Sequence, residues 1–221
     1  MGHCLSASSA NGAARLRVQE SYYLEKMRDH GLHSARSVGW TDYLQIILFE
    51  KISMLLKGAD ISGYFTLLDV GCGLGDYSRY LRDHGYGMID YHGIDVLPEM
   101  AAAARKKYPG HSFLVADFAD PAFSAEFDYI VCSGALNIIT ENNAAKYENF
   151  VRKFIRKMYE HSRRGCAFNL LCAEGRDFFP EDTRFYYARR EEIFEYCSSI
   201  CPDAALEQQE HEFTFTVIMP R

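Results

Sequence analysis

The glycine-rich stretch from Leu67 to Gly75 limits what this chain can fold into more than any other feature. The apolar run over residues 65–70 predicts a buried strand, and a helical pattern starts at Asp76. Between them, glycine occupies every second position: Gly71, Gly73 and Gly75. Glycines at such a turn let the backbone approach a ligand closely, and the helix start offers unpaired N–H groups. The sequence therefore predicts a strand–loop–helix unit that binds a ligand.

Two carboxylates flank this loop and indicate the charge of the ligand. The dinucleotide-binding fingerprint G-x-G-x-x-G requires a glycine where this chain has Asp76. Asp69 lies two residues before the first glycine of the loop. Two carboxylates would repel a pyrophosphate but would suit a ligand that carries an ammonium and a sulfonium group. The pattern therefore favours S-adenosylmethionine over a dinucleotide.

Three later predicted strands end in residues that suit the rest of a nucleoside. Asp95 ends the second strand, where an acid can accept hydrogen bonds from both ribose hydroxyls. Asp117 and Phe118 follow the third strand, and such a pair can accept from the adenine amino group and stack on the base. The fourth strand runs into Ser133. Because the carboxyl ends of parallel strands lie at one edge of a sheet, we expect these residues to converge.

In the order and spacing of these motifs, the chain resembles the class I S-adenosylmethionine-dependent methyltransferases from about residue 65 to its C-terminus. The resemblance implies an α/β, Rossmann-like fold with a seven-stranded, mostly parallel sheet, one antiparallel strand and flanking helices. It also implies the cofactor S-adenosyl-L-methionine. The residues expected to bind it are Asp69, Gly71, Gly73, Gly75, Asp95, Val96, Asp117, Phe118 and Ser133, together with Trp40 and Gln45 from the preceding segment.

Apolar periodicity predicts the remaining elements of this fold. Helices are expected over 18–30, from Thr41 to near Gly58, over 76–84 and 98–107, from Thr140 to Gly165, and over 189–199. Strands are expected over 65–70, 91–95, 111–116, 127–132, 166–171, 204–207 and 212–219. Alternating strands and helices predict parallel pairing with right-handed crossovers.

The predicted domain organisation is an N-terminal helical extension over residues 1–60 and a cofactor-binding domain over 61–221. Residues 1–16 are rich in small residues and are expected to be disordered. In many small-molecule methyltransferases of this class, the segment before the first strand covers the cofactor. We therefore expect the extension to act as a lid. Its aromatic and polar side chains suit an acceptor pocket: Tyr22, Tyr23, His30, His33, Trp40, Tyr43 and Gln45.

Composition narrows the class of protein further. The net charge of −6 over 221 residues argues against nucleic acid as a partner. The sequence has no apolar run of about 18 residues, so we predict no transmembrane segment. The seven cysteines have no metal-ligand spacing, so we predict no metal site. Their odd number and mostly core placement fit a reducing compartment, so we predict a cytoplasmic location. The start, MGHCLS, also fits an acylation pattern, so membrane anchoring through Gly2 and Cys4 is the alternative location.

The expected reaction is methyl transfer to an O or N atom of a small molecule, such as a sugar, a polysaccharide precursor or a secondary metabolite. The candidate catalytic residues are Asn137, Asn169, Tyr186 and His211, with His211 the best candidate for a general base. Each of these could equally be a structural hydrogen-bonding residue. The oligomeric state is not predicted.

Two other functions remain open from the sequence. One is a non-catalytic protein that binds S-adenosylmethionine, because intact binding motifs say nothing about turnover. The other is aminopropyl transfer. Enzymes of that kind usually carry a further acidic pair after the fourth strand, and residues 133–136 of this chain contain no acid.

Overall fold

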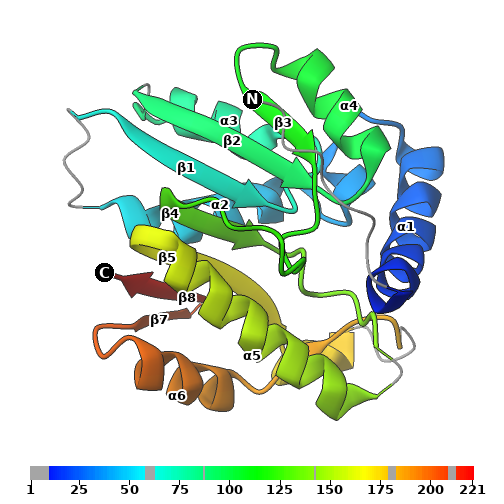
Figure 1. Cartoon of the computed structure of the whole chain (residues 1–221). Helices are drawn as coiled ribbons and strands as arrows, with labels where there is room; N and C mark the ends of the chain where they lie inside the picture. Colours follow the sequence, from blue (N-terminus) through cyan, green and yellow to red (C-terminus); the bar gives the residue numbers. More distant parts are fainter. Residues whose placement is uncertain (1–9, 58–62, 87, 142, 179–182, 209–212) are drawn as a thin grey trace.

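The chain folds around one twisted sheet (Figure 1). The computed structural model describes residues 10–57, 63–86, 88–141, 143–178, 183–208 and 213–221, and for residues 10–16 it describes the backbone alone. The strands are β1 (Phe65–Val70), β2 (Ile89–Asp95), β3 (Ser112–Val115), β4 (Phe127–Ser133), β5 (Ser162–Cys172), β6 (Tyr187–Ala188), β7 (Ala205–Gln208) and β8 (Thr214–Pro220).

The strand order is β3-β2-β1-β4-β5-β8-β7. The pairs from β3 to β5 are parallel, whereas β8 is antiparallel to both β5 and β7. The short strand β6 adds to β5 outside this order and makes the eighth strand. The predicted fold class is therefore confirmed, with one additional two-residue strand.

Helices cover both faces of the sheet. They are α1 (Ala10–His30), α2 (Asp42–Ser53), α3 (Asp76–Asp83), α4 (Pro98–Lys107), α5 (Ala144–His161) and α6 (Arg190–Ile200), with short 3₁₀ turns η1 (Ala35–Val38), η2 (Met54–Leu56) and η3 (Ala173–Phe178). Successive strand residues point to opposite faces, so Leu68 and Ile130 pack with α5 and α6, while Leu67 and Val131 pack with α2 and α3.

The two helices before β1 play different structural parts. Helix α2 lies in the core, because Phe49 and Ile52 are buried against the sheet. Thr41 caps this helix as predicted, with its side-chain oxygen accepting from the N–H of Leu44. Helix α1 lies instead across the end toward which the arrows of β1 and β2 point (Figure 1). Of these two helices, α1 is therefore the one that lies across the carboxyl ends of the strands.

Three predicted boundaries differ from the structure. Helix α1 begins at Ala10, so the backbone over 10–16, predicted as disordered, is helical. Three of these seven residues are alanine, and Arg15 and Leu16 follow them; all three residue types favour helix. Asn143, and not Thr140, caps α5 by accepting from two backbone N–H groups. Gly165 lies inside β5 and does not end the helix. A Cβ at Gly165 would come within 2.6 Å of the carbonyl oxygen of Met219 on β8, so glycine is needed there for strand pairing.

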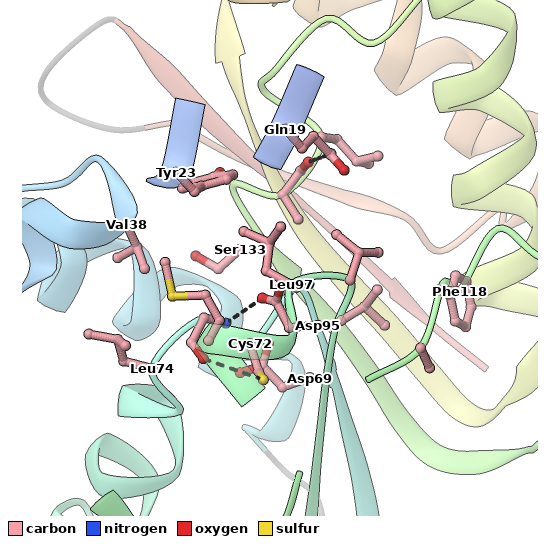
Figure 2. Close-up of a pocket in the computed structure, with 18 of the residues that line it drawn as sticks. Gln19, Tyr23, Val38, Asp69, Cys72, Leu74, Asp95, Leu97, Phe118 and Ser133 are labelled. Carbon is pink, nitrogen blue, oxygen red and sulfur yellow. Dashed lines mark hydrogen bonds between the residues drawn. The ribbon is translucent and has the colours of Figure 1, made fainter. Parts of the chain in front are cut away.

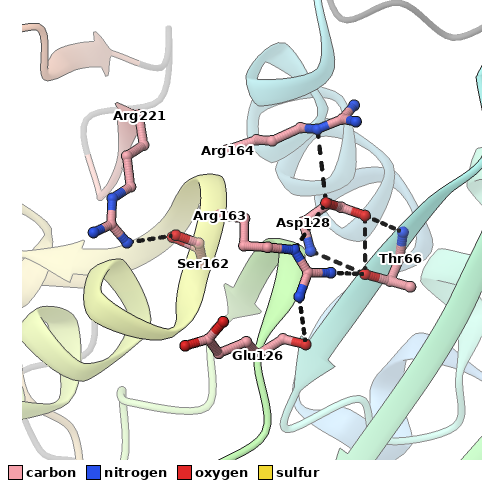
Figure 3. A network of polar contacts seen from close by, with 7 residues as sticks. All are labelled: Thr66, Glu126, Asp128, Ser162, Arg163, Arg164 and Arg221. Atoms are coloured by element: carbon pink, nitrogen blue, oxygen red, sulfur yellow. Dashed lines mark hydrogen bonds and ion pairs between the residues drawn. The ribbon is translucent and has the colours of Figure 1, made fainter.

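A polar network joins the amino-terminal ends of three parallel strands (Figure 3). These strand starts lie at the opposite end of the sheet from α1 (Figure 1). Asp128 on β4 accepts hydrogen bonds from the backbone N–H and hydroxyl of Thr66 on β1, and from Arg163 on β5. Burial raises the pKa of Asp128, but these hydrogen bonds outweigh it and lower the pKa below its usual value. The network therefore fixes the strand starts far from the predicted binding site.

Six cysteines are buried as free thiols: Cys72, Cys132, Cys166, Cys172, Cys197 and Cys201. Within the described ranges, no three or more His, Cys, Asp or Glu side chains group where they could hold a metal ion. No helix in the same ranges is long and apolar enough to cross a membrane. Gly2 and Cys4, the predicted acylation sites, lie outside the described residues.

Candidate active site

The glycine-rich loop after β1 has the backbone that the sequence predicts. Gly71, Gly73 and Gly75 have φ values of 73°, 52° and 75°, a left-handed region in which other residues are strained. A Cβ at Gly71 would lie 2.3 Å from the Cβ of Ala135, and one at Gly73 would lie 2.8 Å from Val38. A side chain at either position would therefore clash with its neighbour, so both the backbone conformation and the close packing require glycine.

Asp69 is a buried carboxylate at the end of β1. It accepts a hydrogen bond of 2.5 Å from the hydroxyl of Tyr91. Burial raises the pKa of Asp69 to about 7, against the lowering effect of this hydrogen bond. A buried acid of this kind gains most from a cationic ligand group, which would favour its charged form.

Asp95 ends β2 and organises the loop. One of its carboxylate oxygens accepts from the N–H of Gly73 and the other from the N–H of Leu97, both at 2.9 Å. Burial raises the pKa of Asp95 to about 6, although these backbone hydrogen bonds lower it. Each oxygen keeps a second lone pair that a ligand hydroxyl can use.

Asp76 was expected to present its negative charge to the ligand, but the structure pairs its carboxylate with other side chains. One of its carboxylate oxygens accepts from the ammonium of Lys107 and from the hydroxyl of Tyr108, both at 2.6 Å. Its charge is therefore balanced inside the protein, whereas the buried acids Asp69 and Asp95 make no ion pair with any described residue.

A pocket opens at the carboxyl ends of the strands and collects these groups (Figure 2). It is lined by ten of the eleven residues predicted to bind the cofactor: Asp69, Gly71, Gly73, Asp95, Val96, Asp117, Phe118, Ser133, Trp40 and Gln45. Gly75 does not line it. That glycine precedes α3, where a Cβ would lie 2.7 Å from the ring of Phe113. Its role is to allow close packing below the loop.

One face of α1 closes this pocket from the other side. Figure 2 shows Gln19 and Tyr23 on α1, across from Asp69 and Asp95 at the strand ends. The amide nitrogen of Gln19 donates to the carbonyl of Ala135 at 3.4 Å, which ties α1 to the segment after β4. Burial raises the pKa of Tyr23 well above its usual value, so its hydroxyl stays protonated.

A second pocket of about 360 Å³ adjoins the first. Tyr23, Val38 and Trp40 line both pockets and form the junction between them. The other described residues that line the second pocket are Tyr22, Lys26, His30, Arg36, Gly39, Thr41, Leu44, Gly134, Asn137, Ile138, Leu171, Phe185 and Phe213. Two joined pockets with a shared aromatic wall suit a pair of ligands that react with each other.

The family of the chain follows from sequence comparison. A family model described as a methyltransferase domain matches residues 67–165. Rv1506c, a Mycobacterium tuberculosis protein that is named as a methyltransferase, is 34% identical over 134 residues, which cover 60% of this chain and 78% of that protein. The chain belongs to the class I S-adenosylmethionine-dependent methyltransferases. A malonyl-[acyl-carrier protein] O-methyltransferase of Enterobacter lignolyticus is 31% identical over 121 residues, or 53% of this chain and 42% of that protein.

Solved structures show the same fold for this methyltransferase. The magnesium protoporphyrin IX methyltransferase of Synechocystis PCC 6803, crystallised with S-adenosylmethionine, has a TM-score of 0.62 at 14% identity, covering 99% of this chain and 100% of that one. The plantazolicin methyltransferase BpumL, crystallised with S-adenosylhomocysteine and a substrate analogue, has a TM-score of 0.65 at 10% identity, covering 96% and 98%. The cofactor is S-adenosylmethionine, and the buried acids and glycine loop fit it.

Asp117 and Phe118, the pair predicted to bind adenine, are divided between the pocket and the core. Asp117 lines the pocket, and its carboxylate accepts from the N–H of Ala119 at 2.9 Å. Phe118 also contributes to the wall, but its ring is 1% exposed and packs against Phe123 and Phe154 at centroid distances of 5.1 and 5.0 Å. Phe118 therefore supports the wall from within the core.

The three predicted catalytic residues that the structure describes do not come together. Asn137 lines the second pocket. Asn169 lines neither pocket and donates to the hydroxyl of Ser133 at 3.3 Å, so it lies behind a cofactor-pocket residue. Tyr186 is buried in the core against Tyr147, with ring centroids 5.1 Å apart, and lines neither pocket. His211 lies outside the described residues.

Sequence reasoning missed part of both pockets. It named Tyr22, Tyr23 and His30 as lid residues but overlooked Gln19 and Lys26. The signal was present, because positions 19, 23, 26 and 30 follow the three- and four-residue spacing of one helix face. The residues Phe185 and Phe213 carried no local pattern, since they reach the pocket only through the tertiary fold.

Proposed function

We propose that this methyltransferase transfers a methyl group to an O or N atom of a small molecule bound in the second pocket. The observation that carries this proposal is the junction formed by Tyr23, Val38 and Trp40, which line both pockets. A molecule in the second pocket would meet the reactive end of the cofactor at this junction. Holding two reactants in line there supplies much of the catalysis that such a reaction needs.

The cofactor pocket has a separate task for each acid. We assign the ribose hydroxyls to Asp95, whose two oxygens accept hydrogen bonds from Gly73 in the glycine-rich loop and from Leu97 after β2. Asp69 lies next to the loop as a buried acid and is assigned to the ammonium group. Asp117 is assigned to the adenine amino group. The bound cofactor supplies an electrophilic methyl group on a sulfonium.

Asn137 is the residue best placed to orient the acceptor. Its side chain is 4% exposed, and its Oδ1 accepts from the N–H of Leu171 at 3.0 Å. Its Nδ2 has no hydrogen-bond partner among the described residues. Leaving a buried donor without a partner costs free energy. A methyl-accepting molecule whose oxygen accepted this hydrogen bond would therefore bind more tightly. If the acceptor is a hydroxyl, we propose His211 as its general base.

Calorimetric titration with S-adenosylmethionine and S-adenosylhomocysteine tests the cofactor site first. We expect both to bind with micromolar affinity. Release of S-adenosylhomocysteine in a screen of small hydroxyl and amine acceptors then tests transfer. Binding of both compounds without release for any acceptor would support the non-catalytic alternative, and transfer of an aminopropyl group from the decarboxylated cofactor would support the other one.

A further inference from the structure

The second pocket has a charge opposite to that of the first. None of the described residues that line it is acidic, whereas three are basic: Lys26, His30 and Arg36. The first pocket is lined instead by four aspartates, Asp69, Asp76, Asp95 and Asp117. The two joined pockets therefore select for ligands of different charge.

The cations of the second pocket are not balanced by nearby acids. Lys26 and Arg36 make no ion pair with any carboxylate in the ranges that the structure describes. Lys26 extends over the ring of Tyr22, with 5.6 Å between its ammonium nitrogen and the ring centroid. By contrast, Arg184 also lies over this ring but pairs with Glu25 at 3.2 Å. The charges of Lys26 and Arg36 are therefore available to a ligand.

The geometry of α1 sets the distance between these charges and the reaction centre. Gln19 lines the first pocket, Tyr23 lines both, and Lys26 and His30 line only the second. At a rise of about 1.5 Å per residue, Lys26 lies about 4.5 Å and His30 about 10 Å along the helix from Tyr23. Lys26 and His30 are thus about one and two helical turns, respectively, from Tyr23 at the junction.

We propose that the acceptor of this methyltransferase is a small anionic molecule, a carboxylate or a phosphate, with an aromatic or apolar body. Its anion binds Lys26 and Arg36 in the second pocket, and its body lies against Trp40 and Phe185. The atom that receives the methyl group lies at the junction, near Asn137, so the anion is an anchor and not the methylated group. This inference rests on the proposed function, because it takes the second pocket as the acceptor site.

Trp40 provides a direct assay. It is the single tryptophan of the chain and lines both pockets, so its fluorescence reports binding to either. With the protein saturated by S-adenosylhomocysteine, we would titrate phenylacetate, phenyl phosphate and the neutral phenylacetamide. We expect one or both anions to bind at least about tenfold more tightly than the amide, as one additional charge-assisted hydrogen bond would give. The two anions distinguish a carboxylate from a phosphate site.

Variants connect this preference to the two cations. Lys26→Met combined with Arg36→Gln should bring the ratio of anion to amide affinity close to one, with the affinity for S-adenosylhomocysteine retained. Lys153→Met is the matched control, since Lys153 is exposed on α5 and lines neither pocket. It should keep the preference.

The inference is overturned if phenylacetamide binds as tightly as the anions, if no probe binds at millimolar concentration, or if the double variant keeps the preference. Each of these outcomes leaves the proposed function standing when S-adenosylhomocysteine still binds and the acceptor screen yields product. Failure of S-adenosylhomocysteine to bind a folded sample would instead refute the proposed function itself.

Discussion

Replacing Asp95 by asparagine tests the cofactor site with the least disturbance. The carboxylate accepts from the N–H groups of Gly73 and Leu97, so alanine would leave both donors without a partner. Asparagine keeps the shape and one accepting oxygen. It removes the charge and places an NH₂ group where the second oxygen receives a hydrogen bond.

The expected loss follows from the hydrogen bonds involved. A hydrogen bond to a charged group is worth about 1.5–3 kcal/mol, and about 1.4 kcal/mol corresponds to a factor of ten in affinity. Loss of one ribose hydroxyl contact in Asp95→Asn should therefore weaken binding of S-adenosylhomocysteine by roughly 10- to 100-fold. Calorimetric titration measures this, and thermal unfolding checks that the variant is folded.

A matched control is available at the other end of the sheet. Asp128→Asn makes the same chemical change in the network with Thr66 and Arg163, far from the pocket. Its affinity for S-adenosylhomocysteine should equal that of the unmodified protein. If a folded Asp95→Asn variant binds as tightly as this control, the assignment of the ribose contacts to Asp95 is wrong.

Four further outcomes are expected. The pKa values of about 7 for Asp69 and about 6 for Asp95 mean that both acids take up a proton as the pH falls through this range, so affinity for S-adenosylmethionine measured calorimetrically should fall below about pH 7, and a flat profile would contradict their role. Tyr186→Phe should keep turnover, because Tyr186 lies in the core; a large loss in the acceptor assay would return it to the catalytic residues. Gly134→Ala should cost about 1–2 kcal/mol in unfolding free energy and alter Trp40 fluorescence, because Gly134 has a φ of +78° and its new Cβ would lie 3.0 Å from the indole. Asp128→Asn should lower the urea-derived free energy of unfolding by about 1–2 kcal/mol at neutral pH, and the difference should vanish in acid, because a carboxyl with a lowered pKa loses its stabilising effect as the pH falls through that pKa.

The sequence correctly predicted the glycine-rich loop and the acids at the strand ends of the first pocket, because local rules determine them. Gly71 and Gly73 need positive φ values, and Asp69 and Asp95 end strands whose carboxyl ends meet in any parallel sheet. Such features are visible in a few neighbouring residues. The boundary at Gly165 was wrong for the opposite reason, since its glycine is required by β8, more than fifty residues later in the chain.

The positions of the residues expected to contact the acceptor were predicted less well, because these positions depend on tertiary contacts. Tyr186 and Asn169 occupy positions near strand ends, as expected, but their side chains point into the core or behind Ser133. Asp76 was read as a free charge because its partners Lys107 and Tyr108 lie about thirty residues away. Side-chain direction and long-range pairing cannot be read from spacing alone.

The position of α1 has a consequence for how this protein diverges from its relatives. Most of the described residues around the second pocket precede residue 45, whereas the family match covers 67–165. Most residues of the first pocket lie within the family match, so the two pockets are built mainly from different stretches of the chain. Under the proposed function, changes within the first stretch would alter acceptor choice while the glycine loop and its acids remain intact. Exchange of residues 10–44 between related proteins would be a direct route to chimeras with new acceptors.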